Sequence, residues 1–590
     1  MFFYKKLGQI FQKGEAKGFN RSISLSHPKK SVKGSATKNN KSLMSNVAVS
    51  NNNINLLLTL LMALILLVTS WSADDAFHGF VMSQNLANGH GFVYNVGERV
   101  TASTCPLFSL ILAGLFFITR QMVASSVVLC VFLSVASFYI VLTKFADTRW
   151  KKIAVFFTCI LAQGFFSYAN CGLENCLLFF LETIYLYLIL SVQTYDFKRL
   201  FLIALICSFL LMTRLDVAVL IFIPTAYIFL ARHSGTFVKM ISAGLVGLLP
   251  FFCFSVFCIF YFGFLFPNTY YAKLYSGLPQ IEYFERGLEY IWVSALYDFL
   301  LMGIIVLAPF FYYKKTKLGL AILAGIVLKI LYIIYIGGDF MVCRHFSDVF
   351  WYSLCLILWS TKGTETIRLF SKNISFKRVS VLFLIICTIL TILFRPFVTL
   401  HMWPDKSISN ERAIYWQNTS IVVRKIAYFR GKPDPLDSLW KFDRRKVSVI
   451  KASPEQYKGA LLSWAPGVLV YETNENFYEQ DIFALGDPLL ARLPASHEPH
   501  WRVGHLKHYV PEGYPESLQL GRNEIVDPNL HEYYDIILSI TRGELFSLDR
   551  IKQVIYFQLG KYDYLLNAFL SAHQQEIAEG FSYKDPFFDY

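Results

Sequence analysis

The sequence predicts a polytopic α-helical membrane protein with about eleven transmembrane helices and a C-terminal soluble α/β domain. Of its 590 residues, 55% are hydrophobic and 16% are charged, whereas a soluble protein of this length carries about 25% charged residues. Long apolar runs recur between residues 54 and 400, and the mean hydropathy is +0.44. Residues 401–590 mix short apolar runs with Pro, Gly and charge, which is typical of a folded soluble domain.

The N-terminal half divides into a tail and a membrane domain. Residues 1–50 are rich in Lys, Ser and Asn, which predicts a disordered basic cytoplasmic tail. The run Ile54–Trp71 begins too late for a cleaved signal peptide and is expected to be the first transmembrane helix. Further runs lie near 121–143, 152–168, 174–192, 199–213, 217–231, 239–262, 290–311, 318–336, 347–361 and 378–400. They define a transmembrane domain over 51–400, in which Pro106–Ile118 is expected to be an interfacial helix of the first outer loop, 72–120.

Positive charge supports this topology. With a cytoplasmic N-terminus, the loops expected on the inner side all contain Lys or Arg, as inner loops usually do. These residues are Arg149, Lys151, Lys152, Lys198, Arg199, Arg232, Lys239, Lys314, Lys315, Lys317, Lys372, Lys377 and Arg378. The pattern predicts a multi-pass protein of a bacterial inner (plasma) membrane with a periplasmic C-terminal domain. The net charge of +14 is dispersed, so nucleic acid is not an expected partner.

The positions of the cysteines indicate which disulfides and metal sites to expect. The 11 cysteines lie between Cys105 and Cys387, so the C-terminal domain is expected to fold without disulfides. The sequence has no CxxC or Cys/His spacing typical of zinc. We therefore predict no metal site and no cofactor, with a divalent cation as the one alternative.

An acidic pair opens the first outer loop. Asp74 and Asp75 follow the first apolar run directly. Partial desolvation and mutual repulsion raise the pKa of one member of such a pair unless a cation compensates. A carboxylate there can accept a hydroxyl proton or stabilise positive charge on a sugar ring. We predict both as catalytic, with Asp74 the more critical because it is closer to the membrane.

The loop continues with glycines, asparagines and a tyrosine over Asn85–Arg99 and ends at Pro106-Leu107-Phe108. Asp74–Phe108 resembles the first outer loop of the GT-C glycosyltransferases, above all the terminal β-(1→2)-arabinofuranosyltransferases of mycobacteria and their bacterial relatives. That family has Asp-Asp-Ala-Phe, Gly-x-Gly and Asn-x-Gly-Glu-Arg in this order. The chain departs from the family at His78–Met82, where an Arg is usual, and at Phe108, where a Trp is usual.

Other segments extend the resemblance over about residues 54–560. Cys171–Asn175 looks like a small-Gly-Leu-Glu-Thr segment, Arg214-Leu215-Asp216 like Arg-Pro-Asp, and Phe266–Lys273 like Leu-Pro-Asn-Thr-x-Tyr-x-Lys. Gly337–Met341 with Arg344 is similar to Gly-Gly-Asp-x-Met…Arg. Three segments of the C-terminal region also resemble segments of this family: Gly486–Pro494, Gly504-His505 and Pro511–Tyr514. The resemblance implies an enzyme that moves a sugar, arabinofuranose among the candidates, from a polyprenyl-phosphate donor to a cell-envelope glycan or glycolipid.

Roles follow from the chemistry of that donor. A lipid-phosphate leaving group needs cations, and Lys273 and Arg344 are expected to contact it because both lie in outer motif loops. Sugar or acceptor hydroxyls are expected to meet polar groups of the same loops. These groups are Glu174, Asn268, Tyr270, Asp339 and His78. Glu174 and Asp339 could instead hold Lys273 and Arg344 in place.

Three alternatives are consistent with the sequence. The chain could be a GT-C enzyme that uses another prenyl-linked sugar, such as a hexose or aminoarabinose. It could be a transporter or flippase of lipid-linked glycans, although such a protein should carry charges near the bilayer midplane and often repeated halves. A membrane scaffold that binds glycan without chemistry is the third.

Overall fold

A computed structural model describes residues 36–274, 276–312, 316–369, 372–399, 407–437, 448–450, 459–463, 466–473, 477–481, 483–497 and 501–578. The chain divides into two units, Met1–Asn53 and Ile54–Tyr590. Helix α2 (Ala36–Val68) begins inside the stretch predicted to be a disordered tail, and residues 1–35 lie outside the described residues.

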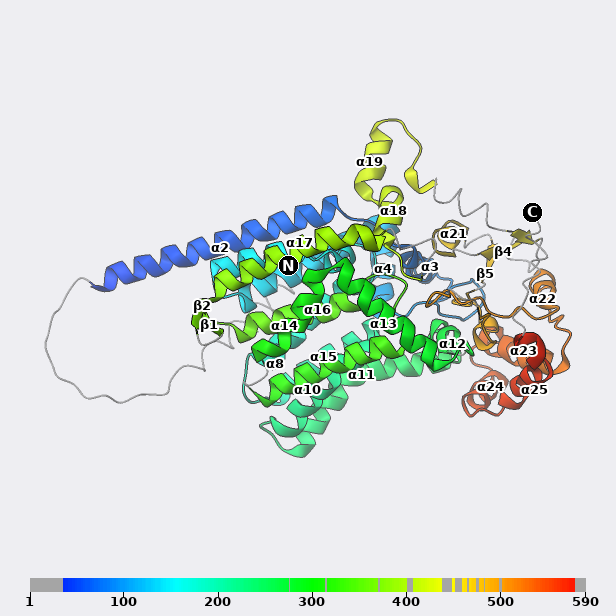
Figure 1. Ribbon diagram of the computed structural model, residues 1–590. Coiled ribbons are helices and arrows are strands. Elements are labelled where there is room, and N and C mark those ends of the chain that lie inside the picture. The colour runs from blue at the N-terminus through cyan, green and yellow to red at the C-terminus, as the bar shows by residue number, and fades with distance from the viewer. Residues whose placement is uncertain are drawn as a thin grey trace. The chain divides into compact units, whose positions relative to one another are not determined.

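Helices make up most of the described chain (Figure 1). Four are long and apolar enough to cross a membrane: α5 (Met122–Ile140) with its π-helical extension η1 (Val141–Phe145), α11 (Phe237–Phe262), α15 (Lys317–Tyr335) and α17 (Phe376–Thr399). Helices α13 (Gln280–Tyr297) and α14 (Phe299–Tyr312) together would add a fifth, but they are bent by 109° at Asp298. The described part of the chain is therefore a helical protein of membrane type.

Shorter helices fill the rest of this region. Four apolar ones have between 10 and 17 residues: the end of α2, α4 (Pro106–Thr119), α8 (Asn175–Leu190), and η2 (Leu215–Val217) with α10 (Ala218–Ala231). The others are α3 (Asp74–Ala87), α6 (Arg149–Leu161), α7 (Gln163–Tyr168), α9 (Phe197–Thr213), α12 (Asn268–Leu274) and α16 (Arg344–Ser360). A hairpin of β1 (Thr366–Leu369) and β2 (Lys372–Ser375) precedes α17.

About eleven spans were predicted, but only four or five described helices are long and apolar enough to cross a membrane. The run at 152–168 is broken at Ala162 into α6 and α7, and the run at 290–311 bends at Asp298. The run at 347–361 belongs to α16, in which thirteen of 17 residues are buried among neighbouring helices. An apolar run signals burial against protein as well as contact with lipid, so hydropathy alone counted core helices as spans.

The loops that were predicted to be basic and cytoplasmic gather at one end of the helices. Lys151 Nζ donates to the carbonyl of Thr361 at 2.6 Å, and Tyr195 N donates to the carbonyl of Arg232 at 3.1 Å. Two further predicted basic residues of this set, Lys314 and Lys315, lie outside the described residues. The β1–β2 hairpin marks this end in Figure 1, and the C-terminal elements lie at the other.

The C-terminal region is mainly helical, not α/β as predicted. Its one sheet of described residues has three short strands in the order β3 (Ser448–Ile450), β4 (Gly459–Ser463), β5 (Phe477–Asp481), with β3–β4 antiparallel and β4–β5 parallel. The helices are α18 (Glu411–Thr419), α19 (Ile421–Phe429), α21 (Pro466–Thr473), η3 (Leu490–Arg492), α22 (Tyr514–Leu520), α23 (Pro528–Arg542), α24 (Leu548–Gln558), α25 (Asp563–Ala572) and α26 (Gln574–Ala578). Pro and Gly between short apolar runs produced turns between helices here, rather than between strands.

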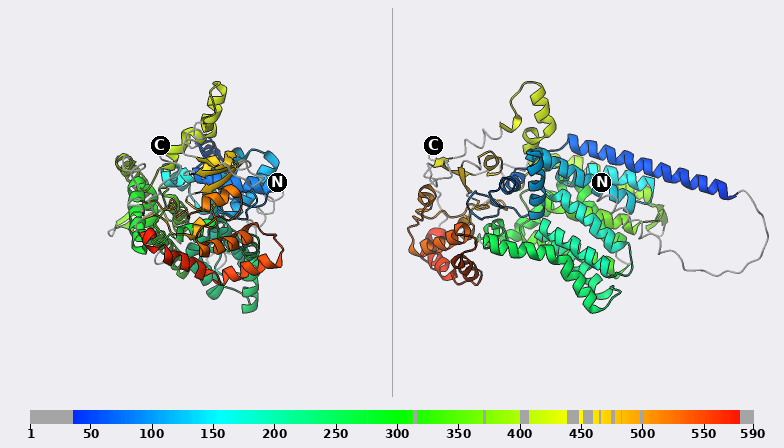
Figure 2. Two further views of the ribbon diagram at one scale, coloured as in Figure 1. Left: turned by 90° about the vertical axis from the view of Figure 1, so that its right-hand side faces the viewer. Right: turned by 180° about the vertical axis from the view of Figure 1, so that it is seen from behind.

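The two largest hydrophobic cores of the described residues hold these parts. The larger joins the helices from α2 to α17 and contains buried aromatic rings such as Trp71, Phe165 and Trp351. Phe165 and Trp351 stack with ring centroids 5.0 Å apart. The second core lies under α22–α25 and includes Phe264, which follows α11, and Ala272 of α12, so the C-terminal helices are packed onto the helical region directly (Figure 2).

Candidate functional site

Charged side chains from five separate loops meet at the end of the helices that faces the C-terminal region. The loop before α16 supplies Asp339, and Arg344 is the first residue of α16. The turn of this loop requires glycine, because Gly338 has φ +75° and a Cβ there would lie 2.4 Å from Tyr290 Cβ. The Tyr290 hydroxyl donates to the carbonyl of Met341 at 3.0 Å, which fixes the loop against α13.

Arg344 lies at the centre of the cluster. Its guanidinium is 3.1 Å from Asp75 Oδ2, 3.4 Å from Glu174 Oε1 and 3.7 Å from Asp339 Oδ2. Glu174 and Asp339 are buried, and 29% of the Asp75 side chain is exposed. The structure thus brings together four residues that the sequence singled out on separate grounds.

A second arginine extends the cluster into the helices. Arg214 Nη1 is 3.0 Å from Glu174 Oε1, and its Nε is 2.8 Å from Asp216 Oδ1. His345 Nδ1 lies 3.1 Å from Arg214 Nη2. Glu174 therefore binds two guanidinium groups, so it stabilises the cluster as well as being a candidate ligand for sugar.

The carboxylates around Arg344 differ in their proton affinity. Burial raises the pKa of Asp75, but the nearby charge of Arg344, with smaller contributions from His78, His505 and Lys273, outweighs it and leaves the pKa below its ordinary value. Burial raises the pKa of Asp339 above its ordinary value, because Arg344 and Lys273 offset it only in part and Asp75 repels the second charge. Asp75 is thus ionised at neutral pH, and Asp339 is the more readily protonated member.

Lys273 is a cation of this region that no carboxylate neutralises at contact distance. It lies in the last turn of α12, its side chain is exposed, and among the described residues its ammonium makes no hydrogen bond and no ion pair. The side chain lies beside Gly504, where a Cβ would be 3.3 Å from Lys273 Cε. Surrounding protein lowers the pKa of Lys273, while Asp339 and Asp75 act in the opposite direction.

His78 is held by a chain of hydrogen bonds from the C-terminal region. Its Nδ1 lies 3.0 Å from the Tyr94 hydroxyl, which donates to Glu479 Oε2 at 2.6 Å. Because Tyr94 has one proton to give, its oxygen accepts from Nδ1–H, which leaves Nε2 of the neutral ring as an acceptor. Burial lowers the pKa of His78, with Asp75 opposing and Lys273 reinforcing that shift, so the neutral ring predominates at pH 7.

Asp74 has a different environment from its neighbour. Its Oδ1 accepts from the backbone N–H of Val468 in the first turn of α21, at 3.2 Å. A Cβ on Gly467 would lie 2.3 Å from that oxygen, so only glycine allows this approach. Asp74 therefore joins α3 to α21, and the structure places Asp75, not Asp74, against Arg344.

Asn268 is occupied by protein partners, whereas Tyr270 keeps an exposed side chain. The buried Asn268 amide donates to the carbonyls of Ala484 and Asp487, both at 2.8 Å, and Arg492 donates to its oxygen at 3.4 Å. Asn268 thus fixes the Gly486–Pro494 segment rather than facing the cluster. Tyr270 is 39% exposed and stacks on Phe266 with ring centroids 4.3 Å apart.

Sequence reasoning missed one carboxyl group near the cluster. Glu411 is buried at the start of α18 and accepts from Ser409 Oγ at 2.6 Å. Burial, reinforced by Asp75 and Asp339, raises its pKa to about 7, although the Ser409 hydrogen bond and Arg502 lower it. Ser409 pairs with Met341 in a β-bridge, which is what brings Glu411 to the Asp339 loop. The Glu411 segment lies beyond the last apolar run and carried no motif, so only the fold reveals it.

Charge also extends into the helices themselves. Lys329, fully buried in α15, pairs with Asp216, and its Nζ lies 3.6 Å from Asp348 Oδ2. Neither carboxylate oxygen of the buried Glu182 has a hydrogen-bond partner among the described residues. No group of three His, Cys, Asp or Glu side chains in the described residues could hold a metal ion.

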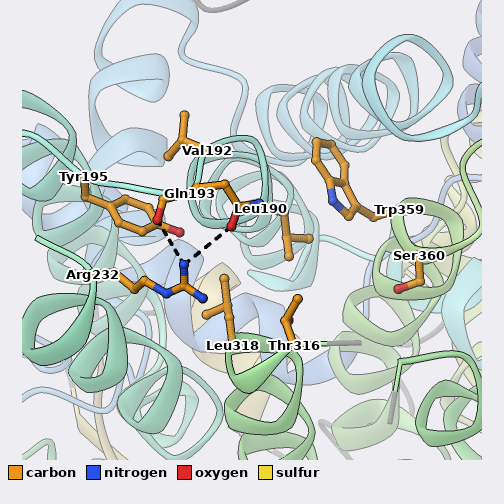
Figure 3. A pocket seen from close by; sticks show the side chains of 9 residues that line it. All are labelled: Leu190, Val192, Gln193, Tyr195, Arg232, Thr316, Leu318, Trp359 and Ser360. Carbon is orange, nitrogen blue, oxygen red and sulfur yellow. Dashed lines mark hydrogen bonds between the residues drawn. The ribbon is translucent and has the colours of Figure 1, made fainter. Parts of the chain in front are cut away.

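A pocket of about 230 Å³ lies at the opposite end of the helices (Figure 3). It is lined by Leu190, Val192, Gln193, Tyr195, Arg232, Thr316, Leu318, Trp359 and Ser360. Arg232 Nη1 donates to the backbone carbonyl and the side-chain oxygen of Gln193 at 3.4 and 3.5 Å. The described residues that line the pocket include one cation, Arg232, and no carboxylate.

Comparison with known proteins does not extend these observations: no family model, curated protein or solved structure matches the chain.

Proposed function

We propose that this protein is a membrane glycosyltransferase that transfers a sugar from a polyprenyl-phosphate donor to a cell-envelope glycan or glycolipid on the outer face of the inner membrane. The observation that carries the proposal is the position of Lys273. It is a cation without a contact partner among the described residues, close enough to Asp75 and Asp339 for each to influence its pKa. A phosphate and a reacting sugar need that combination of a cation and nearby carboxylates.

The roles follow from the partners of each group. In a single displacement, the acceptor hydroxyl oxygen bonds to the anomeric carbon, and the bond from that carbon to the phosphate oxygen breaks. Asp75, which is ionised, takes the hydroxyl proton. The polyprenyl phosphate leaves with the electron pair, and Lys273 stabilises its charge while Arg344 holds Asp75 in place. His78 Nε2 accepts a hydrogen bond from a sugar or acceptor hydroxyl.

Arabinofuranose is the sugar that the resemblance favours, and another prenyl-linked sugar is compatible with the same groups. The proposal places the end of the helices that carries the cluster on the outer face of the membrane. It also keeps Glu174 and Asp339 near the sugar, but it gives Asn268 a structural role because its amide groups already bind protein.

A lipid-linked glycan transporter is the second candidate. The buried Lys329 favours it, because this cation lies six residues from the end of α15, about 9 Å along the helix axis, and is therefore inside a candidate span. Lys329 is balanced by Asp216 and Asp348, however, which suits a structural ion pair equally well.

One experiment separates the candidates. The full chain is reconstituted in phosphatidylcholine nanodiscs with a panel of polyprenyl-phosphate sugars and envelope glycan acceptors, and new glycosidic linkages are measured by mass spectrometry. We expect transfer with at least one donor, and loss of that transfer in Asp75→Asn. If the folded protein forms no linkage with any donor, but moves labelled lipid-linked glycan across a vesicle membrane, the transporter replaces the enzyme.

A further inference from the structure

The pocket of Figure 3 lies at the ends of several helices. Leu190 ends α8, Ser360 ends α16, and Leu318 lies in the first turn of α15. With 19 residues, α15 is about 28 Å long, close to the ~30 Å hydrocarbon layer. When α15 crosses the membrane, its first turn therefore reaches the level of the lipid headgroups, and the pocket lies at the same level.

Arg232 lines this pocket with a guanidinium that has no ion pair among the described residues (Figure 3). Its Nε donates to the Tyr227 hydroxyl at 3.2 Å, and Nη1 makes two long hydrogen bonds to Gln193, at 3.4 and 3.5 Å. The described residues offer no hydrogen-bond partner to Nη2. Arginine binds phosphate through paired N–H groups, so Arg232 can take up an anion without releasing a carboxylate.

Further cations lie around the pocket. Lys362 Nζ is 3.5 Å from the ring centroid of Trp359, which lines the pocket. Lys144 Nζ is 5.9 Å from the ring centroid of Tyr187, and that ring lies 6.4 Å from the ring of Trp359. These ammonium groups add to the positive potential that Arg232 produces.

Two acidic residues of the neighbouring loops have partners of their own. Asp147 pairs with Lys151 at 2.6 Å and accepts from the N–H of Gly363 at 2.5 Å. The side chain of Asp196 caps α9 by accepting from the N–H of Arg199 at 3.0 Å. Neither carboxylate is among the described residues that line the pocket, so the charge of Arg232 is not cancelled there.

The cavity has room for a phosphate group. Its volume is about 230 Å³, whereas a single water molecule needs roughly 10–15 Å³. The wall carries the hydroxyl group of Thr316 as well as the apolar side chains of Leu190 and Leu318. Such a wall suits a charged oxygen-bearing group that is attached to an apolar or weakly polar body.

We propose that this pocket binds a phosphate group, with Arg232 as its direct contact and Lys362 and Lys144 contributing positive potential. The headgroup of an anionic phospholipid and a soluble phosphate share this chemistry. The bound group joins the loop after α8 to the ends of α15 and α16, so it should stabilise this end of the helices. The inference does not depend on the proposed function, because the Arg344 cluster lies at the opposite end.

Binding to the full chain in detergent tests the proposal. The protein is titrated separately with phosphatidylglycerol, with diacylglycerol of the same acyl chains, and with inorganic phosphate. Bound lipid is counted by native mass spectrometry and bound phosphate by equilibrium dialysis. Arg232→Gln removes the cation, and Val192→Phe fills the pocket but keeps every cation. Lys239→Gln is the control, because it removes an exposed cation of α11 that does not line the pocket.

We expect one saturable equivalent of phosphatidylglycerol or of inorganic phosphate, and the arm that saturates identifies the source of the phosphate. Arg232→Gln and Val192→Phe should each weaken this binding by about tenfold or more, whereas Lys239→Gln should leave it unchanged. Thermal unfolding of each variant identifies one that fails to fold, and the other pocket variant then decides the matter.

Three results would overturn the proposal. Saturable binding in neither phosphate arm would show that the pocket holds no phosphate. Diacylglycerol binding as tight as that of phosphatidylglycerol would show that acyl chains, not phosphate, are bound. Equal affinity in the wild type and in both folded pocket variants would place the bound phosphate elsewhere on the protein.

Discussion

The acidic pair at the start of α3 offers a test in which neighbouring residues act as control for each other. Asp75→Asn removes the charge 3.1 Å from Arg344 and the group proposed to accept a proton. Asp74→Asn makes the same chemical change one residue earlier, where the oxygen accepts from the N–H of Val468. We expect Asp75→Asn to abolish most transfer and Asp74→Asn to preserve it, which reverses the order predicted from the sequence.

The structure sets the size of both effects. In Asp75→Asn, Arg344 keeps Glu174 at 3.4 Å and Asp339 at 3.7 Å, so it is not left as an unpaired charge. Losing one partly exposed ion pair should cost about 1 kcal/mol of folding stability, whereas losing a proton acceptor should lower kcat by ~10²–10⁴. In Asp74→Asn, the amide oxygen can still accept from Val468, so stability should change by less than about 1 kcal/mol.

The assay measures kcat at saturating donor and acceptor in nanodiscs, and thermal unfolding of the same samples. The two expected kcat values differ by about 100-fold or more while both proteins stay folded. A modest difference in the purity of the two samples therefore cannot account for the expected result. A kcat for Asp75→Asn within about threefold of wild type would refute its role as proton acceptor. Equal large losses in both variants, with normal folding, would instead show that the pair acts as a unit.

Other perturbations test the remaining groups. Lys273→Ala should raise the donor KM by about 10- to 100-fold with a smaller change in kcat, since it removes a phosphate partner; an unchanged donor KM would exclude that contact. Tyr94→Phe should raise the acceptor KM about tenfold, because the ring of His78 loses its hydrogen-bond partner. Tyr478→Phe is the control: it removes a comparable buried hydrogen bond to a carboxylate and should leave the acceptor KM unchanged. Equal acceptor KM values in the two variants would show that Tyr94 does not position His78 for the acceptor. The pKa of Glu411 is raised from 4.5 to about 7 in the folded protein, so the folded state binds this proton more tightly than the unfolded state. The free energy of unfolding of the wild type should therefore fall by up to about 3 kcal/mol as the pH rises from 4.5 to 8. In Glu411→Gln that decline should disappear, and parallel pH profiles of melting temperature for the two proteins would contradict it.

The alternation of basic loops with motif loops predicted that the loops around Asp75, Glu174, Asp339 and Arg344 lie on the same side of the membrane. Each motif follows or precedes an apolar helix, and alternate helix ends must lie at the same end of a bundle. The number of spans could not be predicted in the same way. Hydropathy does not distinguish α16, which is buried by protein, from α11, which exposes apolar side chains along its length.

Side-chain partners account for the other differences. Nothing in the sequence indicates that Asp74 would meet Gly467, almost 400 positions later, because that contact depends on how the C-terminal region packs. The same applies to Glu411, which reaches the Asp339 loop only through the bridge between Ser409 and Met341. Adjacent acidic residues on a helix point in directions about 100° apart, so a shared motif does not imply a shared role.

The arrangement of ion pairs also decides where an incoming anion can bind. Arg344 and Arg214 share Glu174, and each has a further carboxylate within hydrogen-bond distance, Asp75 and Asp216 respectively. A phosphate that displaced Glu174 from either arginine would leave this buried carboxylate with one guanidinium partner fewer, whereas displacing the partly exposed Asp75 from Arg344 should cost only about 1 kcal/mol. Lys273 has no such partner among the described residues, so it can bind an anion without breaking an ion pair. We therefore propose Lys273 as the first contact of a lipid phosphate at this cluster, with the arginines holding the neighbouring carboxylates in place.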